Sequence, residues 1–254
     1  MLASPSLLLA ASFLLSSSSL IVLAQKDPAT NVTRYLTQPS LPVLDVVQNR
    51  TTTQQVPTDG HLLVTPRSSN GGSLYILNAT TGSPVWISQE SAWNTTSTSA
   101  GSTTSQIGPQ NLQMGTFRGQ PVLSYWVGTE MSQAGYGNGR NILLNTSYGV
   151  IANFSAPGPA GSDLHEFLLT GNDTAVVSQY NPVGGKDTSG ITNGAQGNSS
   201  WIVDGCFYEL ALPDANQTFA WCASEGGVRF NETYTAPSVA PTSNETAWDW
   251  FHVS

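Results

Sequence analysis

Two stretches of similar pattern decide the fold class. Leu74–Trp86 reads LYILNATTGSPVW, and Phe207–Trp221 reads FYELALPDANQTFAW. In each, an apolar run leads into a turn rich in Asn, Asp, Gly or Pro, and a second run ends in Trp. Short apolar runs separated by turn residues are typical of β-hairpins. Repeated hairpins favour an all-β fold, in the form of a β-propeller, because propeller blades are small antiparallel sheets that recur along the chain.

The same alternation of short apolar runs and turns continues along the chain. Further strands are expected at Pro121–Trp126, Asn141–Leu144, Val150–Phe154, His165–Thr170, Thr174–Ser178 and Trp201–Val203. Loops are expected at 91–106 and 181–199, and 135–140 (GYGNGR) is expected to be a flexible turn, because no strand-to-helix context supports a phosphate loop. No stretch has the 3.6-residue periodicity of a helix. A β-sandwich also uses many short strands, so it remains the alternative fold.

The chain is poor in charge. Of 254 residues, 8 are Lys or Arg and 16 are Asp or Glu, which gives a net charge of −8 and 9% charged residues. Nucleic acid and anionic membrane surfaces are therefore excluded as main partners, because both require clustered cations. The hydrophobic content is 39%, with 7 Trp, 8 Tyr and 8 Phe, so the chain can bury a core. Its solubility must come from something other than charge.

The N-terminus predicts entry into the secretory pathway. Leu7–Ala24 is an apolar stretch, and Val22 and Ala24 suit cleavage by signal peptidase. We expect a signal peptide over 1–24, a polar extension with a short strand at 45–47 over 25–60, and the propeller over 61–254. An uncleaved signal anchor is the alternative. No second apolar run is long enough to span a membrane, so the protein is expected to be secreted.

Glycosylation signals support secretion independently. Of 17 Asn residues, 11 begin an Asn-x-Ser/Thr sequon, against about 4 expected from composition. A glycan-covered surface explains solubility with little charge. The sequons begin at Asn31, Asn49, Asn78, Asn94, Asn145, Asn153, Asn172, Asn198, Asn216, Asn231 and Asn244.

The two cysteines, Cys206 and Cys222, predict one structural disulfide. A hairpin centred on residue 214 places them opposite one another, and the oxidising secretory pathway favours the bond. Closing a loop of this length contributes about 3 kcal/mol in the chain-entropy model. No Cys-x-x-Cys redox motif is present.

Two of the three histidines are candidate site residues. His165 lies in DLHEF (Asp163–Phe167) and His252 in WDWFHV (Trp248–Val253), each beside acids and large apolar groups. Such surroundings can hold an imidazole oriented by a carboxylate, or a hydrogen-bonded structural histidine. His61 follows Asp59-Gly60 and is expected at the surface. The zinc-protease pattern fails after His165-Glu166, and no metal or cofactor is expected.

An ordered series of segments resembles the arylsulfotransferase family, especially its fungal branch. The strongest is GQPVLSYWVG, Gly119–Gly128, and the resemblance covers about residues 34–254. The series continues through Gly135–Gly139, Ser147-Tyr148, Asp163–Phe167, Thr170, Thr174-Ala175, Trp201–Asp204, Phe207–Leu210 and Trp248–Val253. The resemblance implies a β-propeller that moves a sulfuryl group from a phenolic sulfate ester to a phenol, without a nucleotide donor and through a transiently sulfated histidine. By family position, His165 and His252 would contact sulfuryl oxygens or the leaving group, and adjacency suggests that Asp163, Glu166 and Asp249 orient them.

The sequence departs from the family pattern at its end. The family continues as His-x-Asn-Ser where this chain has His252-Val253-Ser254, and no residue here matches the family's sulfated histidine or its site arginine. We therefore expect an incomplete, N-terminal part of the propeller, from a truncated gene model or a fragment, that lacks the nucleophile and is inactive by itself. A non-catalytic secreted propeller that binds a ligand or wall component is the alternative, followed by a glycan-covered β-sandwich adhesion module.

Overall fold

The computed structural model describes residues 60–68, 71–88, 104–131, 135–165, 167–187, 200–227, 243 and 247–253, and short strands within the first 42 residues. The chain forms two compact units, Met1–Thr53 and Gln54–Ser254. The first unit holds an antiparallel sheet of β1 (Ala24–Lys26), β2 (Thr33–Tyr35) and β3 (Gln38–Pro42). Residues 1–23 of the expected signal peptide and the expected strand at 45–47 lie outside the described residues.

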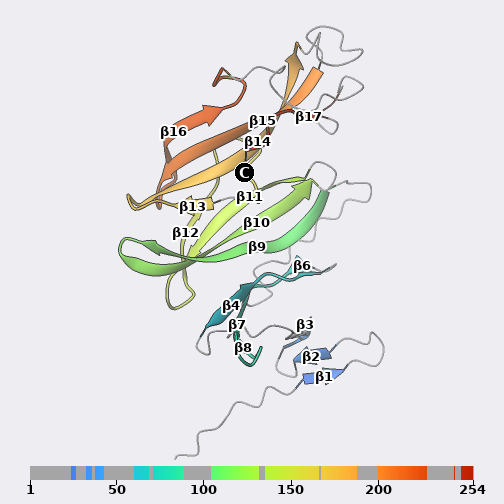
Figure 1. Cartoon of the computed structure of the whole chain (residues 1–254), viewed down its shortest axis with the longest axis vertical. Helices are drawn as coiled ribbons and strands as arrows, with labels where there is room; N and C mark the ends of the chain where they lie inside the picture. Colours follow the sequence, from blue (N-terminus) through green and yellow to red (C-terminus); the bar gives the residue numbers. More distant parts are fainter. Residues whose placement is uncertain are drawn as a thin grey trace, which may run out of the picture. The chain divides into compact units, whose positions relative to one another are not determined.

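The second unit consists of successive antiparallel sheets (Figure 1). The first has the order β4 (His61–Val64), β7 (Tyr75–Asn78), β8 (Pro84–Ile87), beside a ribbon of β5 (Arg67–Ser68) and β6 (Gly71–Gly72). The second has the order β12 (Val150–Phe154), β11 (Tyr136–Leu144), β10 (Gln120–Met131), β9 (Thr104–Phe117). The third has the order β13 (Phe167–Leu169), β14 (Thr174–Lys186), β15 (Ser200–Ala211), β16 (Asn216–Cys222), and β17 (Trp248–Asp249) joins β15 in parallel.

The predicted all-β class is confirmed for the described part of the chain, which contains strands and no helix and hence no helix able to cross a membrane. Within each larger sheet, strands that follow one another in the sequence pair as neighbours. This up-and-down connection of about four strands is the organisation of a propeller blade.

Both hairpins that predicted the fold are present, and each forms the last strand pair of its sheet. In the first, Ile76 pairs with Trp86. In the second, Phe207 pairs with Trp221 and Cys206 with Cys222, and the predicted disulfide joins the two sulfurs. The strand alignment brings the cysteines together, as the turn position predicted.

Three loop expectations were wrong in part. Residues 136–140 are not a flexible turn but the start of β11. They pair with β10 across from the indole of Trp126, and a Cβ atom on Gly139 would lie 2.4 Å from that ring. Glycine is therefore required for close packing and not for flexibility. The expected loop at 91–106 gives way to β9 from Thr104, and that at 181–199 to β14 as far as Lys186.

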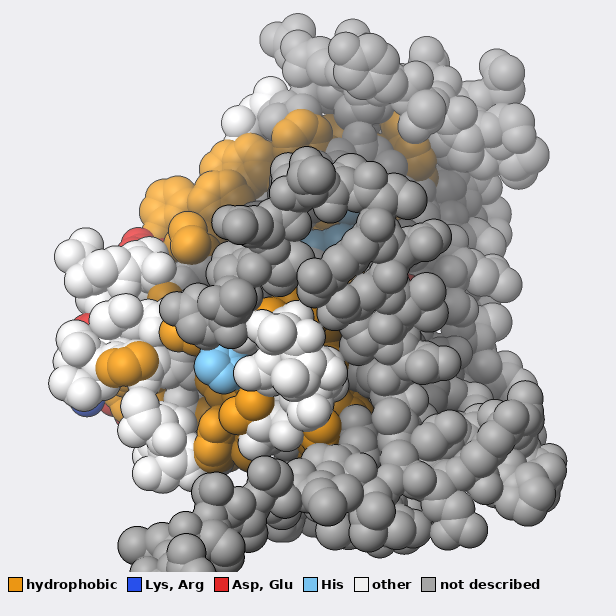
Figure 2. Space-filling view, turned by 60° about the horizontal axis from the view of Figure 1, so that its bottom comes forward, with side chains coloured by type: hydrophobic (Ala, Val, Ile, Leu, Met, Phe, Trp, Pro, Cys, Tyr) orange, Lys and Arg blue, Asp and Glu red, His pale blue; other side chains and the backbone are white. Residues whose placement is uncertain are grey.

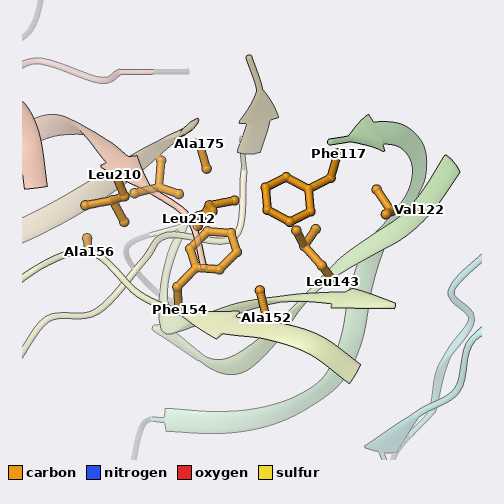
Figure 3. Close-up of a cluster of buried hydrophobic side chains, with 10 residues drawn as sticks. Phe117, Val122, Leu143, Ala152, Phe154, Ala156, Ala175, Leu210 and Leu212 are labelled. Atoms are coloured by element: carbon orange, nitrogen blue, oxygen red, sulfur yellow. The ribbon is translucent and has the colours of Figure 1, made fainter. Parts of the chain in front are cut away.

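The sheet of β9–β12 is buried on both faces. Side chains of one strand alternate between faces, so Leu143 enters one apolar cluster while Ile142 and Leu144 enter another. The first cluster joins this sheet to β14 and β15, and Figure 3 shows Phe117 and Phe154 facing Ala175 and Leu210. The second cluster joins it to the sheet of β4, β7 and β8. Burial on both faces fixes the positions of adjacent sheets and of the loops between them.

Candidate functional site

The candidate site begins with the segment 161–165. This segment is part of the connection from β12 to β13, which links two sheets. Ser162 exchanges two main-chain hydrogen bonds with Gly139 of β11, at 2.8 and 2.9 Å. The indole nitrogen of Trp126 donates to the Ser162 carbonyl at 2.9 Å. On the other side, the Asp163 N–H donates to the Ser178 carbonyl of β14 at 2.8 Å. The segment is thus held between β11 and β14.

Asp163 is fully buried and organises His165. One carboxylate oxygen accepts the Gly137 N–H at 2.6 Å. The other accepts the main-chain N–H of His165 at 2.8 Å and lies 2.6 Å from its Nδ1. In neutral His165, this pairing places the proton on Nδ1 and leaves the lone pair on Nε2. The imidazole orientation is set by a buried carboxylate that the neighbouring sheet holds in turn.

A bulge in β9 supports the same segment from a third side. The register of β9 against β10 shifts at Asn111, whose φ is 55°. Asparagine tolerates this left-handed conformation better than most residues. Its amide Nδ2 donates to the carbonyls of Leu164 and His165, the latter at 3.2 Å. The bulge therefore directs a polar side chain at the main chain that carries His165.

The second histidine, His252, lies in the C-terminal segment of the second unit. Residues 247–253 include β17, and the end of the chain lies near β11 and β14 in Figure 1. Asp249 holds His252 as Asp163 holds His165, with Oδ2 at 2.7 Å from Nδ1. Oδ1 of Asp249 is buried with no hydrogen-bond partner among the described residues. This pair is more exposed than the first, with 41% of the His252 side chain accessible to solvent.

The two imidazoles meet edge to face. Their ring centroids lie 5.2 Å apart at an interplanar angle of 79°. The ring of Tyr180 packs on His252 at 4.8 Å and approaches His165 at 6.2 Å. The ring of Tyr136 stacks on that of Tyr180, with the two ring centroids 5.4 Å apart. Two carboxylate-oriented imidazoles thus share an aromatic wall at the junction of two sheets.

The tyrosine hydroxyls of this wall remain neutral near pH 7. Burial raises the pKa of Tyr180 and of Tyr136, and the charges of Asp163 and Asp249 raise both pKa values further. A neutral hydroxyl can donate as well as accept. Tyr180 does both, since it donates to the Val253 carbonyl and accepts its N–H. The wall therefore also anchors the segment that carries His252.

Four of the five predicted site residues come together: His165, His252, Asp163 and Asp249. The fifth, Glu166, lies outside the described residues. Sequence reasoning missed Tyr180 and Asn111, because neither stands near a histidine in the sequence. His61 is exposed, as expected, and lines a separate apolar pocket.

Metal-ligand residue types gather once in the described part of the chain, at Asp204, Cys206 and Cys222. The two sulfurs are bonded to each other, so they offer no thiolate to a metal. Asp204 instead accepts hydrogen bonds from the main chain and hydroxyl of Ser224. This cluster is structural.

Comparison with known proteins identifies the family. The family model described as arylsulfotransferase (ASST) matches residues 113–254, which is more than half of the chain and includes all of the site residues above except Asn111. No curated protein and no solved structure matches the sequence. The match contains both carboxylate–histidine pairs and the strands that hold them. The chain belongs to the arylsulfotransferase family.

Proposed function

We propose that this chain contributes two histidines to the site of an aryl sulfotransferase that transfers a sulfuryl group from a phenolic sulfate ester to a phenol. The observation that carries the proposal is the contact of His165 with His252, each with Nδ1 on a carboxylate. Two imidazoles that are held in fixed orientations and contact one another can donate or accept protons as negative charge develops on the reacting groups. Family membership supports aryl sulfate chemistry at the level of class.

The proposed reaction has two halves, as the family resemblance implies. In the first, the bond between sulfur and the donor's phenolic oxygen breaks, a bond from sulfur to an imidazole nitrogen forms, and the donor leaves as a phenol with a proton. In the second, the acceptor's phenolic oxygen bonds to sulfur, the sulfur–nitrogen bond breaks, and the acceptor gives up its proton. Negative charge on sulfuryl oxygens and on the leaving phenolate needs hydrogen-bond donors in both halves.

His165 and His252 are assigned to that stabilisation. When protonated, each imidazole forms an ion pair with its aspartate and presents an Nε2–H donor. The same nitrogen, once it has donated its proton to a leaving phenolate, can take a proton from the acceptor. Asp163 and Asp249 keep the rings oriented through both halves.

The sulfated histidine itself is proposed to lie outside this sequence. This part of the proposal rests on the family resemblance, in which no residue here takes the place of the nucleophile or of the site arginine and the ordered segments resemble the N-terminal half of the fungal-type pattern. Secretion, signal-peptide cleavage and glycosylation are part of the same proposal, supported by the apolar N-terminus and the excess of sequons.

The experiment is sulfate transfer from p-nitrophenyl sulfate to phenol by the protein that the native transcript encodes, read from its 3′ end. We expect transfer in the wild type and a loss of at least 100-fold in His165→Ala and His252→Ala, about the range for loss of one charge-stabilising donor. Full activity in both variants would refute the assignment of the histidines. No transfer by the wild type, with p-nitrophenyl sulfate still bound, would favour a binding module instead.

A further inference from the structure

A hollow of about 270 Å³ lies apart from the histidine pair. Strands β4, β7, β8, β9 and β10 and the β11–β12 turn contribute to its wall. Its lining is mainly apolar and includes Leu63, Ile76 and Leu123. The sheet of β4, β7 and β8 lies low in Figure 1 and comes forward in Figure 2, where hydrophobic side chains gather around a histidine. None of the residues that line this pocket is assigned a role in the proposed transfer.

The rim of this pocket leaves apolar groups in water. Met114 is 71% exposed, Val85 53% and Tyr148 40%. Single exposed apolar residues are common, but a group of them around an apolar hollow indicates a surface that something covers.

The β11–β12 turn forms one wall of the pocket and is tightly held. Oδ1 of Asn145 accepts the N–H groups of Ser147 and Gly149, each at 2.9 Å. Tyr148 adopts φ of 60°, a left-handed conformation that costs a bulky residue about 1–3 kcal/mol. Its ring stacks on Trp86 of β8, with centroids 4.4 Å apart and planes at 7°. The turn therefore fixes both an asparagine amide and an aromatic face beside the hollow.

Asn145 also begins the sequon Asn145-Thr146-Ser147. The structure describes five sequon asparagines, and among them Asn145 alone lines this pocket. Its Oδ1 is engaged by the turn, whereas Nδ2 is the atom to which an N-glycan is attached. The other four described sequon residues are Asn78, Asn153, Asn172 and Asn216.

We infer that the pocket is covered by the protein's own N-glycan at Asn145, whose first sugar packs its apolar face on Tyr148 and the rim. A lipid-linked oligosaccharide pyrophosphate supplies the sugar: the bond from its C1 to the pyrophosphate oxygen breaks, the bond from C1 to Asn145 Nδ2 forms, Nδ2 loses a proton, and the lipid pyrophosphate leaves. A tethered sugar has a high effective concentration at the pocket, so a weak stacking contact suffices to hold it. This inference rests on the proposed passage through the secretory pathway.

Ser147 allows a clean test. Its side chain is exposed, and its main-chain N–H makes the bond to Asn145. Ser147→Ala therefore removes the sequon and keeps the turn, while Ser147→Thr keeps both. Asn172→Gln is the matched control, because it removes a sequon at an exposed hairpin turn away from the pocket. All variants are made in a secretory eukaryotic host and, without glycans, in bacteria.

In the secreted protein we expect Tm to fall by about 2–4 °C in Ser147→Ala, as a domain of this size shows for loss of one contact of about 1 kcal/mol. Ser147→Thr and Asn172→Gln should keep the wild-type Tm, and all bacterial variants should match one another. Peptide mass spectrometry should find glycan at Asn145, and a peptide amidase should release it from the native protein more slowly than the glycan at Asn172.

Two results would overturn the inference. One is an unmodified Asn145 beside a glycosylated Asn172. The other is an occupied Asn145 whose loss leaves Tm unchanged. Absence of glycan from every sequon would refute secretion and this inference together, while sulfate transfer by the bacterial protein, measured separately, would leave the proposed reaction standing.

Discussion

The hydroxyl of Tyr180 makes two hydrogen bonds with a single residue, Val253: it donates to the main-chain carbonyl at 2.8 Å and accepts the main-chain N–H at 2.9 Å. Tyr180 lies in β14, 73 residues before Val253. Its ring also packs on His252. One side chain thus attaches the end of the chain to the third sheet and sets the position of a candidate site histidine.

Tyr180→Phe tests that attachment, because it keeps the ring and removes both hydrogen bonds. We expect a loss of about 1–3 kcal/mol in the free energy of unfolding and faster hydrogen exchange at the Val253 amide. Tyr208→Phe is the control, since its hydroxyl bonds to Gln179 and not to Val253. Unchanged exchange at Val253 in Tyr180→Phe would show that other contacts hold the segment.

Asp163→Asn should destabilise the protein more than Asp249→Asn. The buried Asp163 carboxylate accepts N–H groups at both oxygens, and an amide would direct its NH₂ at one of those donors. A cost of about 3 kcal/mol is expected, against about 1 kcal/mol or less for the more exposed Asp249. Urea unfolding measures both values. Equal losses would contradict the structural role given to Asp163.

Alkaline pH should weaken the fold from about pH 10 upward. Burial raises the pKa of Tyr125, Tyr136, Tyr180 and Tyr208 above the ordinary value of 10.0. Above pH 10 the unfolded chain releases these protons while the folded protein keeps them. Ionisation therefore lowers the free energy of the unfolded state alone, and the free energy of unfolding falls. Below pH 10 both states hold the protons and these groups cause no change. Urea midpoints between pH 8 and 11, with phenolate absorbance as the readout of ionisation, test the prediction, and a flat midpoint across pH 10 would contradict it.

Gly139→Ala should be poorly tolerated. The added Cβ would lie 2.4 Å from both the Trp126 ring and the Val127 carbonyl, so ring or strand must move, and we expect a loss of about 2 kcal/mol or more. Gly171→Ala is the matched control, because nothing lies within 4 Å of the position that its added methyl group would take, and a change within about 0.5 kcal/mol is expected. Thermal unfolding compares the two. A small loss of stability in Gly139→Ala would show that the Trp126 ring can move to admit the added methyl group.

Local pattern predicted most of the hairpins because hairpin pairing is decided within a short stretch. Asn78 shows this: its Oδ1 accepts the N–H groups of Thr80 and Thr81, each at 2.9 Å, and closes the turn between β7 and β8. The pairing of Cys206 with Cys222 follows equally from the turn between them. Such interactions involve residues close in sequence, so the sequence displays them.

The errors have the opposite origin. The strand that begins at Tyr136 contains alternating glycines, which indicate a turn when read locally. They are required by Trp126 on the adjacent strand, whose indole occupies the space that side chains would fill. β9 was missed for a similar reason, since its bulge at Asn111 serves the distant segment at 164–165.

The sequence by itself determined the all-β class, the hairpins, the disulfide and the two candidate histidines with the acids beside them, because these depend on residues within a few positions of each other. Only the tertiary structure decided that His165 and His252 meet, that Tyr180 attaches the second to the third sheet, and that Asn145 borders an apolar pocket. Each of these contacts joins residues far apart in the chain, and only the packing of one sheet on the next sets their distance.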